Sequence, residues 1–229
     1  MFEKQTEYFK HDYTVVTWDI PLHGLSQEYE AFSYKNCADD LQAILDQEGI
    51  FKVILVGMSM GGYPSQEFAF LNPERVEGFV ALDTTPFGTD YYSQSDLRWL
   101  KSVAPLAHLF SDRALRKGMA KSVSRTTYSY HKMMEMLRPF TKAQIIKQMD
   151  IAYGVFVKEN KNVHFTFPVL ILLGEFDKTG KVKRYCQAWS VKEGYPLHII
   201  KNAAHFSNGD NPEQVNSEIK RFIQGIIGD

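Results

Sequence analysis

Short apolar runs alternate with longer amphipathic stretches along most of this chain, and the alternation predicts its fold. Two stretches, 35–49 and 211–227, space their apolar residues as one face of a helix does. The runs that are short enough to be buried strands are 13–20, 52–57, 76–83, 167–174 and 196–203. Strand candidates that alternate with helices are typical of βαβ units. The pattern therefore predicts an α/β fold with a mostly parallel sheet.

The segment from 84 to 165 departs from this alternation. It contains no convincing strand run, but stretches such as 95–110 and 128–140 have helical spacing. No repeat, low-complexity tract or linker separates the strand candidates before this segment from those after it. We therefore expect one α/β core, residues 1–83 and 166–229, with a helical cap inserted at 84–165.

A serine between glycines follows the second strand candidate. Gly57, Ser59 and Gly61 in VILVGMSMGG form the pattern G-x-S-x-G, and a helical stretch follows. A sharp turn of this kind, from strand to helix, presents the serine hydroxyl and tolerates only small neighbours. The backbone N–H of Met60 would then face a developing oxyanion at the helix N-terminus. The alternative interpretation is a glycine-rich turn in which Ser59 only caps the helix.

A serine hydroxyl becomes a strong nucleophile only when a base takes its proton. Asp177 follows the strand candidate 167–174, and His205 follows the candidate 196–203. Both side chains would therefore lie beyond the carboxyl ends of parallel strands, where functional groups gather in such sheets. In this interpretation His205 is the base and Asp177 orients its ring. Each residue alone could equally be a solvated turn residue.

Two other carboxylates stand at the ends of strand candidates and compete with Asp177. Asp83 ends the run 76–83, and Glu175, the weaker competitor, directly follows another run. We expect Asp83 to accept hydrogen bonds from its own loop, residues 83–86, as turn carboxylates commonly do. Asp177 is therefore the preferred partner of the histidine.

Four blocks of the sequence resemble the consecutive signature blocks of the α/β-hydrolase superfamily. They are TVVTWDIPLHGLS, VILVGMSMGG, LLGEFDKTG and NAAHFSN, and they cover both segments of the expected core. The resemblance implies that Ser59 is the nucleophile, Asp177 the acid and His205 the base, with Met60 as one oxyanion donor. It also implies a cap over the pocket and cleavage of a carboxylic ester or a related acyl compound. Such a resemblance indicates the mechanism better than the substrate.

The beginning of the chain departs from the family pattern. Members normally have an earlier strand that ends in a His-Gly loop and supplies the second oxyanion N–H, ahead of the helix that residues 2–10 resemble. His23 and Gly24 belong to a later block and do not replace that loop. We expect either an upstream extension with this strand and loop, or a chain that is a homodimer or weakly active. The alternative function is a hydrolase-fold protein that binds a ligand with little turnover.

Composition excludes several other classes of function. The 229 residues carry a formal net charge of -1, with 23% charged and 44% hydrophobic residues, which gives no electrostatic case for nucleic acid or a membrane surface. Neither a signal peptide nor a membrane-spanning run is indicated, and two cysteines outside any CxxC pair, Cys37 and Cys186, fit a reducing cytoplasm. Histidine spacing and nucleotide-binding motifs give no support for a metal or a cofactor, and we expect none.

One local feature does suggest a property of the substrate. Residues 98 to 142 carry two acidic side chains, Asp112 and Glu135, against ten basic ones. The basic residues are Arg98, Lys101, Arg113, Arg116, Lys117, Lys121, Arg125, Lys132, Arg138 and Lys142. The first interpretation is an ordinary solvated helical face. The second is attraction of an anionic small-molecule substrate.

Overall fold

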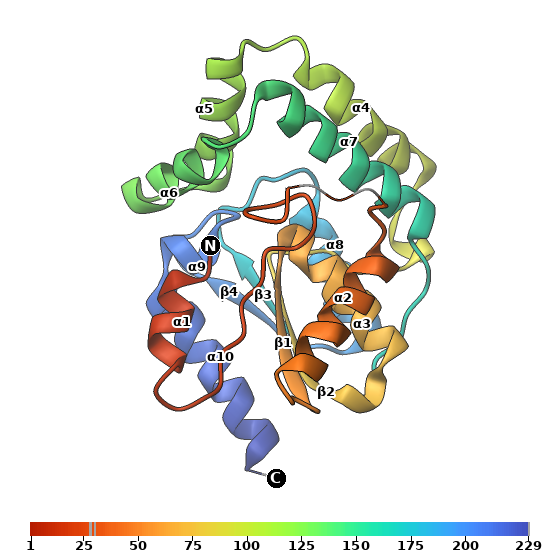
Figure 1. Cartoon of the computed structure of the whole chain (residues 1–229), viewed down its shortest axis with the longest axis vertical. Coiled ribbons are helices and arrows are strands. Elements are labelled where there is room, and N and C mark those ends of the chain that lie inside the picture. Colours follow the sequence, from red (N-terminus) through yellow and green to blue (C-terminus); the bar gives the residue numbers. More distant parts are fainter. Residues whose placement is uncertain (28, 30, 229) are drawn as a thin grey trace.

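A parallel sheet of four strands forms the centre of the computed structural model, which describes residues 1–27, 29 and 31–228 (Figure 1). The strands are β1 (Val53–Met58), β2 (Val76–Leu82), β3 (Val169–Gly174) and β4 (Leu197–Ile200), and they lie side by side in that order. Every neighbouring pair is parallel, so all four carboxyl ends lie along one edge of the sheet. The predicted α/β fold with a mostly parallel sheet is confirmed. Three residues of the predicted core lie outside the described residues: Glu28, Glu30 and Asp229.

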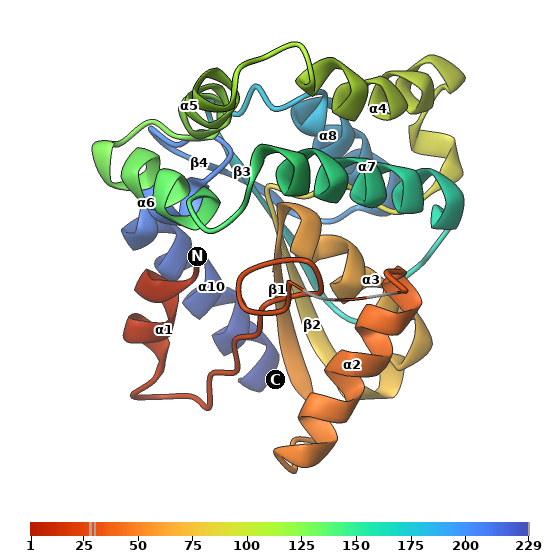
Figure 2. The same cartoon turned by 45° about the horizontal axis from the view of Figure 1, so that its top comes forward.

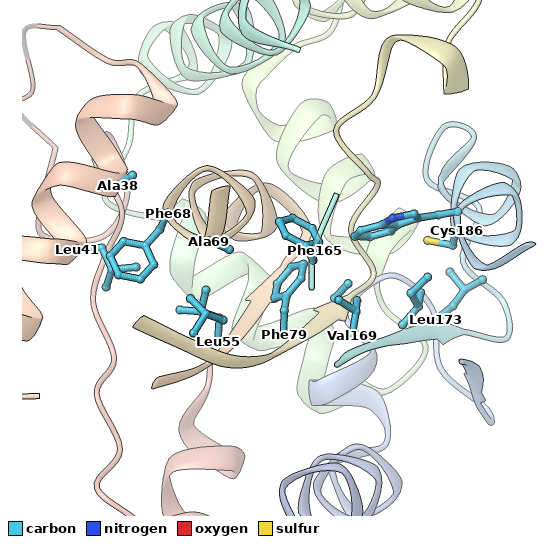
Figure 3. Packing of buried hydrophobic residues seen from close by; sticks show 14 of the residues in the cluster. Ala38, Leu41, Leu55, Phe68, Ala69, Phe79, Phe165, Val169, Leu173 and Cys186 are labelled. Atoms are coloured by element: carbon cyan, nitrogen blue, oxygen red, sulfur yellow. The ribbon is translucent and has the colours of Figure 1, made fainter. Parts of the chain in front are cut away.

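Helices cover both faces of the sheet because the strands are apolar on both sides. On one face lie α2 (Tyr34–Gln47), α3 (Gly62–Leu71) and α8 (Val182–Glu193). Figure 3 shows this layer, in which Phe68 of α3 lies on the same side of the sheet as Phe79 of β2. Both side chains are fully buried, and the ring centroid of Phe79 lies 6.4 Å from that of Trp189 on α8, so both α3 and α8 pack on this face.

The opposite face is covered by α1 (Glu3–Phe9) and α10 (Pro212–Ile227). They pack on the strand residues that alternate with those of the first layer, such as Val80 and Leu172. Helix α10 begins at a proline, and the side chain of Asn211 accepts a hydrogen bond from its first turn. The amphipathic helices predicted at 35–49 and 211–227 are therefore both present, with ends that differ by at most two residues.

One predicted strand is wrong, since residues 13–20 form no strand in the described part of the chain. Among the described strands, β1 is hydrogen-bonded to β2 alone and not to this segment, which runs beside it in Figure 2. Some of its side chains are nevertheless partly buried: Tyr13 and Val15 pack against the cluster that includes α10, and Trp18 packs against the cluster that includes α2. The apolar pattern indicated burial, but burial does not supply the backbone partners that a strand requires.

Four helices fill most of the segment between β2 and β3. They are α4 (Gln94–Ala107), α5 (Asp112–Val123), α6 (Thr127–Leu137) and α7 (Lys142–Glu159). Each follows a serine or threonine whose side chain accepts a hydrogen bond from the first turn, namely Ser93, Ser111, Thr126 and Thr141. The helices share a small apolar cluster and lie beyond one end of the sheet in Figures 1 and 2. The division into core and cap at 84 and 165 stays a prediction.

The remaining helical elements are short. One turn of helix, α9 (Ser207–Asp210), precedes α10, and 3-10 turns lie at Ser59–Gly61, Pro73–Arg75 and Thr89–Tyr91. Within the described ranges, no helix combines the length and the apolar character that crossing a membrane requires.

Candidate active site

Ser59 lies at an abrupt change of direction between β1 and α3. Strand β1 ends at Met58, and the next residue, Ser59, has a φ of 48°, in the left-handed region. A residue with a Cβ seldom adopts this conformation, because the Cβ approaches the following carbonyl oxygen. Such strain persists only where the surroundings hold the residue in place, and it is concentrated at functional sites. The side chain of Ser59 stays partly exposed at the carboxyl end of the strand.

Two close contacts show which glycines this turn needs. A Cβ on Gly57 would lie 2.7 Å from the Cα of Gly62, and a Cβ on Gly62 would lie 2.2 Å from Oγ1 of Thr84. A Cβ on Gly61 would meet nothing within 4 Å, and Gly61 has ordinary helical angles, φ -62° and ψ -18°. The G-x-S-x-G pattern marks the turn correctly. However, packing requires Gly62, which lies outside the pattern, and not Gly61.

The structure brings Ser59, His205 and Asp177 together. Asp177 lies in the turn after β3, and His205 lies in the loop between β4 and α9. Oγ of Ser59 is 2.8 Å from Nε2 of His205, and Nδ1 of the same ring is 2.8 Å from Oδ2 of Asp177. When Nδ1–H donates to the carboxylate, Nε2 is left to accept the hydroxyl proton. The other carboxylate oxygen accepts from the backbone N–H of Thr179 at 2.7 Å, which fixes its orientation.

The environment of His205 adjusts its proton affinity in two opposing directions. His205 and Asp177 are each 6% exposed. Burial alone would lower the pKa of His205, because it penalises the charged ring. The hydrogen bond and charge of Asp177, and then the charge of Asp83, outweigh burial and raise this pKa above its usual 6.5. The ring is therefore neutral, and able to take a proton, only above that raised pKa.

Asp83 does not pair with the histidine, and the expectation that it bonds to its own loop is wrong. Its Oδ1 accepts from the N–H of Gly174 at 2.7 Å, and its Oδ2 accepts from the N–H of Ser207 at 3.2 Å and from the Ser207 hydroxyl. Asp83 is completely buried with a φ of 46°, and its carboxylate meets the neighbouring loops across the sheet edge. Burial raises the pKa of Asp83 to about 7.

Glu175, the weaker competitor, holds a different turn. Its carboxylate accepts from the backbone N–H of Asn202 at 3.0 Å and lies 3.5 Å from Nζ of Lys201. It therefore stabilises the turn after β4 and leaves Asp177 as the carboxylate on the His205 ring.

The comparisons with known proteins identify the family of the chain. The sequence profile described as "Alpha/beta hydrolase family" matches residues 2–218. The chain belongs to the alpha/beta hydrolase family. Esterase YbfF of Escherichia coli is similar at 22% identity over 223 residues, which are 93% of this chain and 84% of YbfF.

Two further similarities show how far the likeness extends. A relative from Haemophilus influenzae is 32% identical over 89 residues, which are 39% of this chain and 31% of that protein, so the chain spans about a third of its length. The solved structure of a thermophilic esterase from Thermogutta terrifontis has a TM-score of 0.77 at 20% identity, and the match covers 98% of this chain and 85% of that one. At that identity the structural match establishes the shared hydrolase fold.

One backbone donor of this hydrolase-family chain lies next to Ser59. Met60 is the second residue of the helical turn Ser59–Gly61, and the first N–H groups of a helical turn lack acceptors within it. They also carry partial positive charge, so the N–H of Met60 suits an anion that forms at Ser59. The N–H groups of Leu22 and His23 donate within their own turn, at 2.7 Å and 3.0 Å. Because both N–H groups already donate to carbonyl oxygens of that turn, neither is assigned as a donor to an oxyanion at Ser59.

The inserted helices are hydrogen-bonded to the loop that carries His205. Asp210 of α9 accepts from the backbone N–H groups of Thr126 and Ala204, each at 2.9 Å, and so joins the start of α6 to the residue before His205. The N–H of Phe206 donates to the carbonyl oxygen of Val123 at 2.8 Å. The loop between β4 and α9 is therefore held from both the sheet side and the side of the inserted helices.

The basic residues of the inserted helices lie mostly at the surface. Seven of the ten are exposed, which favours the solvated-face interpretation. A surface hollow of about 420 Å³ near Arg116 and Arg138 lies on these helices and not at Ser59. Arg116 is already engaged there, because it pairs with Asp112 and donates to two backbone carbonyls. In the part of the chain that the structure describes, no three His, Cys, Asp or Glu side chains gather as a metal site.

The first testable prediction separates the two glycines after Ser59. Gly62→Ala should lower the free energy of unfolding by about 1–3 kcal/mol, because its Cβ would collide with the buried Thr84. Gly61→Ala, the matched control, should change it by less than about 1 kcal/mol, in the stabilising direction, because the position is open and helical. Urea denaturation measures both. Equal losses for the two variants would contradict this account of the turn.

The second prediction concerns the proton affinity of His205. A titration of the ring followed by NMR should give a pKa above 6.5 in the native chain, and Asp177→Asn should lower it, because the variant removes the charge that favours the imidazolium. His198 and His164 provide resonances for internal comparison that the substitution should leave in place. A His205 pKa that does not move would show that Asp177 is not its electrostatic partner.

Proposed function

We propose that this chain is a serine hydrolase that cleaves a carboxylic ester or a related acyl compound through an acyl-Ser59 intermediate. The observation that carries the proposal is the unbroken chain of hydrogen bonds from Ser59 through His205 to Asp177. The similarity to esterase YbfF supports the choice of an ester as substrate class. In the mechanism that follows, these three side chains supply nucleophile, base and orienting group, so no step calls for a metal or a cofactor.

The first half of the reaction transfers the acyl group to the protein. Oγ of Ser59 attacks the carbonyl carbon while Nε2 of His205 takes the hydroxyl proton. The carbonyl oxygen becomes an oxyanion that the N–H of Met60 stabilises. When the tetrahedral intermediate collapses, the bond to the leaving group breaks and His205 gives its proton to the departing alkoxide. Asp177 holds the ring in the required tautomer and stabilises the imidazolium between these two transfers.

The second half releases the acid and restores the protein. A water molecule gives a proton to Nε2 of His205 and attacks the acyl carbon of the ester formed with Ser59. Collapse of the second tetrahedral intermediate breaks the bond to Oγ, and His205 returns the proton to that oxygen. The products are the carboxylic acid and the free serine hydroxyl. The strained, partly exposed position of Ser59 suits a group that must meet substrate and water in turn.

We also propose that the helices from α4 to α7 act as a cap over this site. Their hydrogen bonds to the loop that carries His205, directly from Val123 and through Asp210 from Thr126, support a role in positioning as well as in enclosing the substrate. The exposure of most basic side chains argues against a strong preference for anionic substrates. The cap would then select substrates mainly by shape and apolar contact.

The second candidate is a hydrolase-fold protein that binds a ligand with little turnover. One observation favours it: the N–H groups of Leu22 and His23 are engaged within their own turn, which leaves Met60 as the donor assigned to the oxyanion. One preorganised donor contributes about 2.7–4 kcal/mol of transition-state stabilisation. An incomplete set of donors would therefore slow acyl transfer by roughly 10² to 10³ without preventing binding.

The third prediction tests the nucleophile. Ser59→Ala should abolish hydrolysis of p-nitrophenyl acetate and labelling by a fluorophosphonate probe, because the variant lacks the attacking oxygen. Ser122→Ala, which removes an exposed hydroxyl from α5, is the matched control and should behave as the native chain. Circular dichroism should show both variants folded.

Two outcomes would decide against the proposal. Labelling that persists in Ser59→Ala would place the nucleophile on another residue. A native chain that binds esters but hydrolyses none of a panel of activated aryl esters would favour the ligand-binding candidate.

A further inference from the structure

Two residues at the end of β2 are buried at the site, although the mechanism above gives neither of them a step. Strand β2 lies between β1, which leads to Ser59, and β3, which leads to Asp177. The two residues that follow it, Asp83 and Thr84, are 0% and 1% exposed. Neither side chain can touch a substrate from such a position. Any influence on the reaction must therefore act through the groups that they contact.

Their contacts reach the loops of all three proposed catalytic residues. Oγ1 of Thr84 donates to the carbonyl oxygen of Ser59 at 2.7 Å. The carboxylate of Asp83 accepts from the N–H of Gly174, the last residue of the strand before Asp177, at 2.7 Å. It also accepts from the N–H and the hydroxyl of Ser207, two residues beyond His205. A single dipeptide thus joins the ends of three chain segments.

Two features of Asp83 are unfavourable on their own. Its φ of 46° is strained for a residue with a Cβ, and its carboxylate is completely buried. Three donors to the carboxylate favour its ionised form and partly offset burial, which raises the pKa of Asp83 to about 7. A strained backbone and a buried charge in one residue persist only where the surroundings compensate for both. Both features occur in Asp83, which lies where the segments of Ser59, Asp177 and His205 come together, and this location indicates a role in the site.

We propose that Asp83 and Thr84 are positioning residues that hold the backbone of Ser59, the strand end before Asp177 and the loop of His205 in register. The inference rests on the proposed serine hydrolase function. Thr84 fixes Ser59 through its carbonyl oxygen and also fills the space that Gly62 leaves beside the turn. Asp83 fixes the other two segments to each other, because one carboxylate oxygen binds each of them.

The charge of Asp83 gives this role a measurable signature. Asp83, after Asp177, raises the pKa of His205. The titratable groups that face Asp83 are His205, Asp177 and, from α8, Cys186. Removal of the Asp83 charge should therefore lower the pKa of His205 and move the acid limb of the kcat/KM profile to lower pH. A residue that only stabilises the fold would not move that limb.

The fourth prediction uses Asp83→Asn, which keeps the size of the side chain but turns an amide N–H₂ toward one of the donors. We expect kcat for p-nitrophenyl acetate to fall about 10-fold to 10²-fold, because small misplacements of reacting groups have effects of this size. KM should stay within about threefold, since the buried residue does not touch substrate. The acid limb should shift to lower pH.

Two companion variants separate position from charge. Thr84→Val removes the hydrogen bond to the carbonyl oxygen of Ser59, and Ser207→Ala removes one donor to Asp83. Both should lower kcat. Thr84→Val should leave the acid limb in place, because Thr84 bonds to Ser59 and not to the Asp83 carboxylate. Ser207→Ala should move the limb in the same direction as Asp83→Asn, because the lost hydrogen bond favours the ionised form of Asp83. Asp83→Asn combined with Ser207→Ala should lose less activity than the product of the two single losses, because both act through one contact.

Thr85→Val is the matched control. Thr85 is also buried in this loop, but its hydroxyl bonds to Tyr63 and Tyr92 and not to the three segments. It should lower the melting temperature without the loss in kcat or the shift of the acid limb. Equal kcat losses in Thr85→Val and Asp83→Asn, with no shift of the limb in either, would overturn the proposal.

The same assays separate failure of this inference from failure of the proposed function. If Ser59→Ala is inactive while folded Asp83→Asn and Thr84→Val match the native kcat and pH profile, the positioning role is wrong and the serine mechanism stands. If Ser59→Ala stays active, both proposals are wrong. If Asp83→Asn does not fold, Thr84→Val and Ser207→Ala decide: reduced kcat at native KM supports the role, and native kcat in both overturns it.

Discussion

The close approach of β1, α3 and the residues after β2 is the constraint on which the rest of the site depends. Helix α3 begins so near β1 that neither Gly57 nor Gly62 has room for a Cβ, and Thr84 fills the remaining space. The chain reverses there through the left-handed conformation of Ser59, which leaves the hydroxyl facing His205. Because protein interiors are closely packed, a turn built in this way has little freedom to move. Rigid placement of the hydroxyl follows from that packing.

The parallel sheet extends this local constraint to residues far apart in the sequence. The carboxyl ends of the strands share one edge, so the segments after β1, β3 and β4 meet there even though 146 positions separate Ser59 from His205. The inserted helices are tied to the same edge through Asp210 and Val123. The site is thus supported by rigid elements on several sides, which is the condition for exact geometry in a catalytic centre.

The sequence predicted the parts of this arrangement that repeat a simple pattern. The apolar runs located all four strands, and the positions of Ser59, Asp177 and His205 after strand ends indicated the groups that the structure brings together. Residues 13–20 show the limit of such reasoning. Tyr13, Val15 and Trp18 are partly buried against the two clusters, as apolar residues are expected to be. A strand also requires a backbone partner, which the spacing of side chains does not encode.

The partners of Asp83 and the role of Gly62 could not be predicted for a related reason. Both depend on which backbone groups lie across the sheet edge, in segments about 90 or more positions away for Asp83 and 22 positions away for Gly62. The local sequence after β2 predicts that the Asp83 carboxylate bonds to its own loop. In the structure Asp83 has a φ of 46°, and its carboxylate bonds to two other segments instead. Long-range polar contacts of this kind become visible only once the strand order is known.

The most direct test of the account is to trap the covalent intermediate. The native chain is mixed with p-nitrophenyl acetate, quenched in acid within the burst of product release, and examined by intact mass and peptide mass spectrometry. The account expects a mass increase of one acetyl group, located on the peptide that contains Ser59 and absent from Ser59→Ala. Turnover with the acetyl group on another residue, or with no covalent adduct at any quench time in a chain that shows a burst, would contradict it.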